Sequence, residues 1–408
     1  MTSHIEDIKA SGKSRWSDFV LMSMGILHYS SAKEKFTLEE DVQQIFARVS
    51  DMRGQCQSFL VLFADQIFQI LSNSLTLIAS TFDPLGLVLD PFVACANHSC
   101  DPNAFIVMDN QHLSMRSLKA IAKDEEIFIS YIDTTYPFSR RQTELKERFF
   151  FDCKCTKCVQ GSTLNEDRWT GDPRRMPKNW KRYCQVIRDT DPKFAKDVQE
   201  EEDLDEINDS DKAMSIIQDW AFHSLKTIHD KEFAPAKIAV NVERIMDVLA
   251  QTERCPVYRQ PYPSARHELV QSYSHKANFF LAWSHGAKTY FYVDPLLYPQ
   301  THHPLRVVHN ANLAMLTLVV STDLSWREHP ETKEIDFGVL VYYLFLEVVA
   351  NIEKSHGKDN SFAKLLKRKF DQLTTDMTRA DRNAVMKLER RRDGTWRQFR
   401  KFADDVYP

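Results

Sequence analysis

The chain has 408 residues, of which 43% are hydrophobic and 27% charged, and its formal net charge is −4. This length predicts two or three domains, and the near balance of charge gives no global field that would recruit nucleic acid. The apolar runs, such as 337–346, fall far short of the roughly 20 residues that a membrane span needs. The polar segment 1–14 lacks the apolar stretch of a secretory signal. We therefore expect a globular protein that neither enters a membrane nor binds nucleic acid directly.

The first third of the chain predicts a polar lead, a helical segment and then short strands. Residues 1–15 are expected to be disordered, and apolar residues at spacings of three and four predict helices between Trp16 and Ala79. Two apolar stretches, 104–108 and 113–118, flank a polar turn and predict a β-hairpin. A further strand is expected at 127–131 and an amphipathic helix at 137–151.

The remainder of the chain is dominated by the helical period. Residues 160–180 are rich in Gly, Pro and charge, which is typical of a linker. The acidic stretch 200–211 is either a solvated loop or helix end, or an arm for basic peptides. Basic residues between 390 and 401 are either a solvated or ion-paired helix face, or a nucleic-acid or nuclear-import signal. Apolar positions predict helices at 213–228, 236–250, 265–282, 305–321 and 337–353, and a charged helix near 362–391.

The cysteines predict a metal site. Three of the eight are packed into a Cys-x-Cys-x-x-Cys run at Cys153, Cys155 and Cys158. Thiolates at this spacing are typical of tetrahedral zinc, which needs a fourth ligand. Such a run favours a reducing compartment over a disulfide framework. The remaining cysteines outside the motif discussed next are scattered singles.

Three motifs between residues 97 and 158 carry a family resemblance. They are Asn-His-Ser-Cys-Asp-Pro-Asn at 97–103, Asp-Glu-Glu-Ile-Phe-Ile-Ser-Tyr at 124–131, and the cysteine run. In this order they resemble the C-terminal half of a SET domain with its post-SET zinc site, most closely that of the SET-and-MYND (SMYD-type) family. Members of that family are protein-lysine methyltransferases that use S-adenosylmethionine.

The resemblance implies roles for particular residues. Asn97 and His98 would hold the cofactor. Tyr131 would be both catalytic and a cofactor contact: it would end the lysine channel, with its hydroxyl bonded to the substrate amine or beside the transferring methyl. A phenol of ordinary pKa near 10 acts there by orientation and polarisation. Phe151 would pack near the adenine, although it is equally well explained as a core residue. Asn73 would be a further cofactor contact, or else an ordinary polar helix residue. Cys100 would be the fourth zinc ligand beside Cys153, Cys155 and Cys158.

The resemblance also sets the expected architecture. The fold class is α+β, with a small β-rich SET core and zinc site, a helical insert before it, and an all-α TPR-like domain after it. The expected boundaries are a disordered lead at 1–15, the insert at 16–91, the SET half and zinc site at 92–160, the linker and acidic segment at 161–212, and the helical domain at 213–408. A monomer in the cytoplasm or nucleus is expected, with a lysine-bearing protein or peptide as its substrate.

The sequence departs from the family pattern in two places. It contains no Gly-x-Gly, the motif with which a SET domain binds the methionine end of its cofactor, and no dense Cys/His set before residue 97 that would form a MYND module. Three hypotheses follow: an active methyltransferase, whose gene product is longer or whose cofactor site is altered; a degenerate SET remnant that binds or regulates proteins; or a helical adaptor with a structural zinc. The second hypothesis predicts weak binding of S-adenosylmethionine or none.

Overall fold

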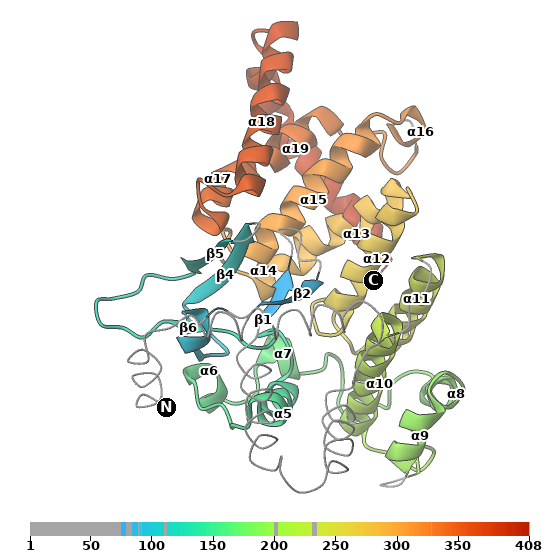
Figure 1. The fold of residues 1–408 in the computed structure, drawn as a ribbon. Helices are drawn as coiled ribbons and strands as arrows, with labels where there is room; N and C mark the ends of the chain where they lie inside the picture. The colour runs from blue at the N-terminus through green and yellow to red at the C-terminus, as the bar shows by residue number, and fades with distance from the viewer. Residues whose placement is uncertain are drawn as a thin grey trace, which may run out of the picture.

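The computed structural model describes residues 75–78, 84–88, 90, 92–109, 112–199, 203–230, 235–327 and 329–407. Short strands lie in the first part of this range and helices make up most of the rest (Figure 1). The chain is thus mostly helical with a small sheet region, as the α+β prediction requires. No helix among these residues is long and apolar enough to cross a membrane. Asn73, and the predicted helical segment up to Ser74, lie outside the described residues.

The strands form three small sheets. β1 (Leu75–Ile78) pairs antiparallel with β2 (Pro84–Val88), and β4 (Ala104–Asp109) with β5 (His112–Ser117). The second pair is the predicted hairpin. β3 (Asn97–His98) and β6 (Phe128–Ile129) pair in parallel. The helical prediction was wrong for β1, where Thr76 and Ile78 favour a strand.

The hairpin β4–β5 is bonded to the helical part of the chain. Arg116 donates to the carbonyl oxygen of Glu353, 3.0 Å away, near the end of α17 (Phe337–His356). Asp109 accepts a hydrogen bond of 2.8 Å from the backbone N–H of Ser361, which begins α18 (Ser361–Ala380). The strands and helices therefore share an interface at this corner.

Three helices follow the strands. α5 (Phe138–Phe149) occupies the predicted amphipathic segment and ends at Phe150, which adopts the left-handed conformation. α6 (Thr156–Val159) lies within the cysteine run, and α7 (Leu164–Asp167) comes shortly after it. α5 buries Leu145 against the cysteines, so the helix and the run pack as one unit.

The expected linker is partly helical. Besides α7 it holds α8 (Trp180–Thr190) and α9 (Pro192–Gln199). α8 buries Trp180, Tyr183, Cys184 and Ile187, which lie on one face at helical spacing and join the large helical core. Composition suggested a linker because charged residues cover the outer face of these helices. The packed helical region therefore begins well before residue 213.

Ten further helices lie between residues 210 and 405 of the described chain. Consecutive long helices pack against one another from α11 to α13, and the series continues through α15, α17 and α18 (Figure 1). This neighbour-to-neighbour packing is compatible with a TPR-like array. Besides α17 and α18, the helices are α10 (Ser210–Asp230), α11 (Pro235–Gln251), α12 (Tyr262–His275), α13 (Phe279–Tyr292), α14 (Asp294–Leu297), α15 (Pro304–Ser321), α16 (Leu324–Arg327) and α19 (Ala384–Asp405).

Two segments predicted as single helices are each divided. The segment 265–282 breaks after His275, because Ala277 is left-handed and the Asn278 side chain caps α13 by accepting from Leu281 N–H. The segment 362–391 breaks between α18 and α19, where Asp381 accepts from the backbone N–H of Asn383 at 2.9 Å. Apolar periodicity continues across both breaks, so it could not reveal them.

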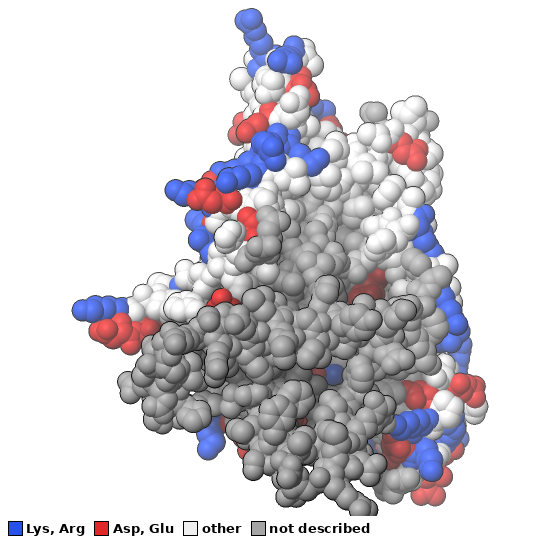
Figure 2. All heavy atoms as spheres, viewed as in Figure 1, with Lys and Arg blue, Asp and Glu red and all other residues white. Residues whose placement is uncertain are grey.

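The centre of the helical region is aromatic. Trp283 is fully buried, with its ring centroid 4.6 Å from that of Phe402 and 5.4 Å from that of Phe399. Its indole N–H donates to the Thr317 hydroxyl at 3.0 Å. The basic tail lies on the exposed face of α19, where Arg391 pairs with Asp336. Figure 2 shows further Lys and Arg side chains along the projecting end of the helical region, interspersed with acidic ones. Both interpretations of this cluster remain predictions, and the ion pair of Arg391 is compatible with the first.

Candidate active site and metal centre

The parallel pairing of β3 with β6 brings two of the sequence motifs together. Asn97 lies opposite Phe128 and His98 opposite Ile129. Asn103, the last residue of the first motif, fixes this crossing with its side-chain amide. Its oxygen accepts from Phe128 N–H at 2.8 Å, and its nitrogen donates to the Glu126 carbonyl oxygen at 2.9 Å. Residues some 30 positions apart in the sequence are thereby held side by side.

His98 lies between the tyrosine and the cysteines. Its Nδ1 accepts a hydrogen bond of 3.0 Å from the backbone N–H of Tyr131. In the neutral ring the proton must then be on Nε2, which lies 3.3 Å from the sulfur of Cys100 and can donate to it. Burial, with a smaller contribution from the Arg141 charge, lowers the pKa of His98 to about 4. The imidazole is therefore neutral at physiological pH and is held from both sides.

Tyr131 is partly buried and firmly placed. Its hydroxyl donates to the carbonyl oxygen of Ala96 at 2.6 Å, and its ring centroid lies 5.2 Å from that of His98 and 4.9 Å from that of Phe149. Burial raises the pKa of the phenol. Tyr131 is therefore protonated at neutral pH, and in this conformation its proton is directed at a backbone carbonyl.

Of the other predicted cofactor residues, Phe151 lies near the same imidazole, with its ring centroid 6.0 Å from that of His98. Asn97 precedes His98 in β3, so its side chain points to the opposite, exposed face of the strand. There its side-chain nitrogen donates to a Glu126 carboxylate oxygen at 2.5 Å. The structure thus groups His98, Tyr131 and Phe151, with Asn97 next to them on the other face of the strand.

The four predicted metal ligands converge. The sulfur atoms of Cys100, Cys153, Cys155 and Cys158 all lie within 4.8 Å of one another, and those of Cys100 and Cys158 are 3.5 Å apart. A regular tetrahedron with Zn–S bonds of about 2.3 Å has sulfur atoms about 3.8 Å apart. Three of the four residues are buried. The donor set and its spacing therefore fit a zinc ion.

The proton affinities of these thiols differ. Burial raises the pKa of Cys153 to about 11 and that of Cys100 further. For Cys155 burial acts in the same direction, but hydrogen bonds from the backbone N–H groups of Cys158 and Cys100 outweigh it and lower the pKa to about 7. Without a cation, Cys100 and Cys153 would stay protonated at neutral pH. A bound cation is therefore needed before all four cysteines can be thiolates.

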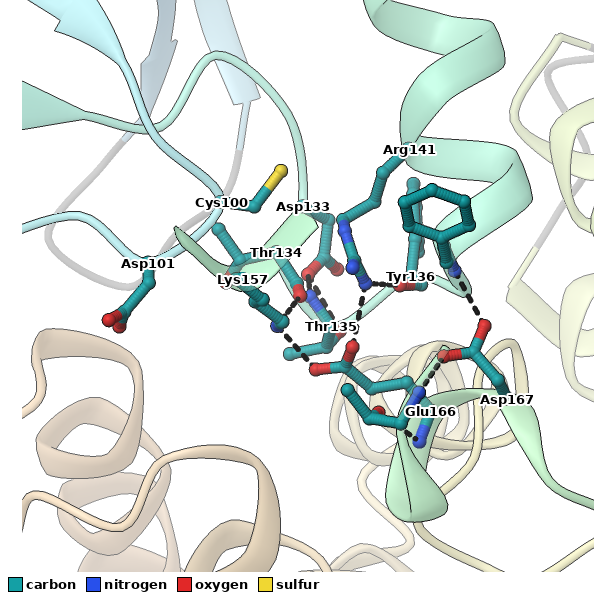
Figure 3. A network of polar contacts seen from close by, with 12 residues as sticks. Cys100, Asp101, Asp133, Thr134, Thr135, Tyr136, Arg141, Lys157, Glu166 and Asp167 are labelled. Carbon is teal, nitrogen blue, oxygen red and sulfur yellow. Dashed lines mark hydrogen bonds and ion pairs between the residues drawn. The ribbon is translucent and has the colours of Figure 1, made fainter. Parts of the chain in front are cut away.

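Arg141 supplies positive charge beside the cysteines (Figure 3). It is fully buried on α5, one turn before Leu145, which packs on the cysteines. Its Nη1 bonds the Tyr136 carbonyl oxygen and lies 2.6 Å from a Glu166 carboxylate oxygen, whereas Nε and Nη2 have no hydrogen-bond partner among the described residues. Its charge acts on Cys100 and Cys158. Zinc with four thiolates carries a net charge of −2, which such a cation partly neutralises.

Glu166 extends this network back to the tyrosine segment. It pairs with Lys157, which lies inside the cysteine run and donates to the Thr134 carbonyl oxygen at 2.8 Å (Figure 3). The Asp133 carboxylate in turn accepts from the backbone N–H of Thr135 at 2.8 Å. The loop 131–136 and the cysteine run are thus held together by charge as well as by packing.

Several residues that build this site were not predicted from the sequence. The motif at 97–103 does not by itself indicate the role of Asn103. Arg141 lies in the predicted amphipathic helix, and its charge alone does not distinguish it from the exposed residues of that helix. Gln142 exchanges two hydrogen bonds with the backbone of Cys153, of 2.9 and 3.0 Å. The position of Arg141 four residues before the apolar Leu145 was the available signal that it faces inward.

A cavity of about 580 Å³ lies between the tyrosine segment and the helical region. Asp133, Tyr136 and Arg140 line one side of it, and helices α10, α12, α13 and α15 line the other. Burial raises the pKa of Asp133, although its hydrogen bonds with Thr135 oppose this. The cavity therefore adjoins the loop that carries Tyr131.

Comparison with known proteins identifies the first part of the chain. Residues 16–132 match the family model of the SET domain. The chain carries a SET domain with SMYD-type relatives. "SET domain and MYND-type zinc finger protein 6" of Schizosaccharomyces pombe is 34% identical over 174 residues, which are 42% of this chain and 31% of that protein. The strands β3–β6 and Tyr131 all fall within the SET domain or at its end.

Two further relatives are named for an activity. "Histone-lysine N-methyltransferase ASHR1" of Arabidopsis thaliana is 32% identical over 145 residues, 35% of this chain and 29% of that protein. "N-lysine methyltransferase SMYD2" of Homo sapiens is 33% identical over 144 residues, 35% of this chain and 31% of that protein. The chain thus matches about a third of the length of these curated relatives. The match to the SET domain begins at residue 16, so it includes the segment expected as an insert.

Proposed function

We propose that this chain belongs to a protein-lysine methyltransferase that uses S-adenosylmethionine to methylate a lysine of a histone or non-histone protein. The observation that carries the proposal is the packing of Tyr131 and Phe151 around the neutral imidazole of His98, next to Asn97, at the end of a SET domain. The names of the relatives favour this activity over the degenerate remnant.

Different residues of the chain would hold the cofactor and orient the lysine. When bound, the cofactor supplies a methyl group on a sulfonium, and a neutral lysine amine displaces the sulfur from it in line. Asn97, His98 and Phe151 would hold the cofactor, the last by packing on its adenine. Tyr131 would orient the amine with its hydroxyl oxygen. Because the phenol stays protonated, Tyr131 acts by position and polarity rather than as a base.

The four cysteines would hold one zinc ion with a structural role. A four-thiolate site is closed and leaves no open position for a substrate. The zinc ion would affect the reaction by fixing the positions of His98 and Phe151, because Cys100 is two residues from His98 and Cys153 is two residues from Phe151. Zinc binding would therefore order both sides of the cofactor site together.

The lysine-bearing substrate would reach Tyr131 from the cavity beside the loop 131–136. Asp133 and Tyr136 offer polar groups there, and the helical region, which we propose to be TPR-like, forms the opposite wall. The chain is proposed to act as a monomer in the cytoplasm or nucleus.

Replacement of Tyr131 by Phe tests the activity. We expect methylation of a histone or peptide library, measured with radiolabelled cofactor, to fall at least about 100-fold, the scale seen when one positioned donor is removed. Zinc content and cofactor affinity, measured by metal analysis and calorimetry, should remain unchanged. Tyr407→Phe, a change of the same kind at an exposed residue far along the chain, is the matched control.

The outcome also decides between the hypotheses. Equal activity in Tyr131→Phe and the parent protein would remove Tyr131 from the site. If the parent protein bound no cofactor and methylated nothing, the degenerate remnant would replace the enzyme.

A further inference from the structure

A second cavity, of about 440 Å³, is lined neither by Tyr131 nor by any of the four clustered cysteines. Its walls come from four parts of the chain: the start of α5, the segment 167–173, the start of α10, and the loop after α11, which contributes two arginines. Two carboxylates and three guanidinium groups line it. The hydrogen-bond and ion-pair partners of these groups show which of them lacks an acceptor.

One of the two loop arginines is fully satisfied. Arg254 is buried, and its Nη2 lies 2.8 Å from a carboxylate oxygen of Asp211. Its Nε donates to the Thr170 carbonyl oxygen at 3.0 Å, and its Nη1 bonds the Ser210 hydroxyl. Every nitrogen of this guanidinium therefore has an acceptor, one of them anionic.

The other loop arginine has no such partner. Arg259 is 3% exposed, and its guanidinium carbon lies 3.3 Å from the centroid of the Trp169 ring. Among the described residues its Nε and Nη1 have no hydrogen-bond acceptor, and no carboxylate forms an ion pair with it. A buried guanidinium without an acceptor is costly, and stacking on an indole satisfies the face of the group but not its N–H edge.

The carboxylates of the cavity are already engaged. Both oxygens of Asp167 accept backbone N–H groups, from Phe138 and from Thr163, each at 2.6 Å. Asp211 is the partner of Arg254. Both carboxylates attract Arg259 through space without bonding it, and three guanidinium groups against two carboxylates leave the lining with a net positive charge. Burial lowers the pKa of Arg259 to about 10, so the guanidinium is still charged at neutral pH.

Two helix starts also line the cavity, through Pro137 and Ser139 of α5 and Asp211 of α10. Each of them already holds a carboxylate: Asp167 accepts the Phe138 N–H, and Asp209 accepts the N–H groups of Asp211 and Lys212. The positive charge left in the cavity is therefore that of its arginines. We propose that this cavity is a binding site for a small oxyanion, a phosphate or carboxylate group, with Arg259 as its principal contact and Trp169 as the plane that positions it.

Titration of the full chain with inorganic phosphate tests the proposal. Calorimetry at constant ionic strength, with chloride as the competing anion, should give saturable binding at one site per chain, and phosphate should raise the melting temperature. Acetate and phosphoserine form the other two arms. Binding of phosphate and phosphoserine but not acetate would assign a phosphate group, and binding of acetate as well would assign a general carboxylate site.

Arg259→Met keeps most of the side-chain volume and removes the charge. We expect at least a tenfold loss of phosphate affinity and no phosphate-dependent rise in melting temperature. Arg174→Met is the matched control, because Arg174 is an exposed arginine nearby that does not line the cavity. It should bind phosphate as the parent protein does.

Two results would overturn the proposal. One is the absence of saturable phosphate or carboxylate binding by the unaltered chain, which needs no variant to fold. The other is unchanged affinity in Arg259→Met. If that variant does not fold, Trp169→Leu replaces it and should weaken binding by loss of the positioning plane; unchanged affinity there would also contradict the site.

Discussion

The region around the cysteines and the helical region are held together by different forces. The former, residues 92–167, pairs strands of two residues and buries small apolar clusters, one of them made of Val93, Ala96, Ala104 and Ile129. Its order depends on side-chain hydrogen bonds, ion pairs and four thiols. The helical region instead has one continuous apolar core that runs from α8 to α19. The residues expected to carry chemistry thus lie in the region where apolar burial contributes least to the free energy of folding. Whether that region folds can therefore depend on a bound metal.

The largest expected effect is the loss of the metal site. Cys155→Ser should remove zinc, because structural zinc binding contributes on the order of 10 kcal/mol to small metal-dependent folds. Hydrogen exchange should then become fast in residues 92–167 and stay slow in α10–α19. Metal analysis should give one zinc per chain before the change and none after it.

Cys95→Ser is the control for that experiment, because Cys95 is exposed and does not belong to the cluster. It should keep its zinc. Unchanged zinc and unchanged exchange in Cys155→Ser would show that the cluster is not a metal site.

Removal of a large side chain from the aromatic core should destabilise the helical region and leave the region around the cysteines intact. Trp283→Ala should destabilise the helical region by about 3–5 kcal/mol, the usual cost of removing a large buried aromatic side chain. Zinc content should be unchanged. The melting temperature of the helical region and the zinc content, measured on one sample, check both statements; loss of zinc in this variant would mean that the two regions unfold as one.

Acid should weaken the helical region through His285. Its Nδ1 accepts from Arg266 at 3.0 Å, and burial, then the Arg266 charge, lowers its pKa from 6.5 to about 3. Between pH 3 and pH 6.5 this histidine is therefore protonated in the unfolded chain but neutral in the folded chain. The free energy of unfolding therefore falls as pH drops below about 6.5. At pH 5 this single group costs about 2 kcal/mol relative to neutral pH.

His285→Gln removes the titrating group and should flatten that part of the curve of stability against pH between 4 and 6.5. His275→Gln, at an exposed position, is the control. Denaturant midpoints measured at several pH values give the slopes, and identical slopes for both variants would remove His285 from the acid response.

The smallest effect concerns the charge beside the cysteines. Arg141→Met should lower zinc affinity by about 10–100-fold, the usual effect of altering a residue that supports metal ligands. Competition with a chelator measures this directly. Arg140→Met, its neighbour, which instead lies over the Phe222 ring, should leave zinc affinity unchanged; equal losses in both would indicate general damage to α5.

Local pattern and chemical spacing predicted the parts of the molecule that depend on nearby residues. Alternating apolar residues gave the hairpin β4–β5, and the helical period placed α10, α11, α15 and α17 closely. The convergence of Cys100 with the cysteine run came from a family resemblance, because the spacing of three cysteines gives no position for a fourth.

What could not be predicted depends on contacts between distant segments. The pairing of β3 with β6 joins two strands of only two residues, too short for any periodicity. Arg259 lies outside the helices, where no periodicity indicates an inward face, and only the folded chain shows that it is buried. For Arg141 the spacing to Leu145 indicates an inward face but not the cysteines beside it. The break at Lys276–Asn278 is set by one left-handed residue and one cap, which apolar spacing does not record.

The way the hairpin β4–β5 meets the helical region gives the docking a direction. A helix ends with a partial negative charge and begins with a partial positive one. Arg116 faces the end of α17, and Asp109 faces the beginning of α18. Each charged side chain therefore lies at the helix end that attracts it. If the hairpin were reversed, Arg116 would face the positive start of α18 and Asp109 the negative end of α17. Electrostatics at this corner therefore favours one orientation of the hairpin over the reverse.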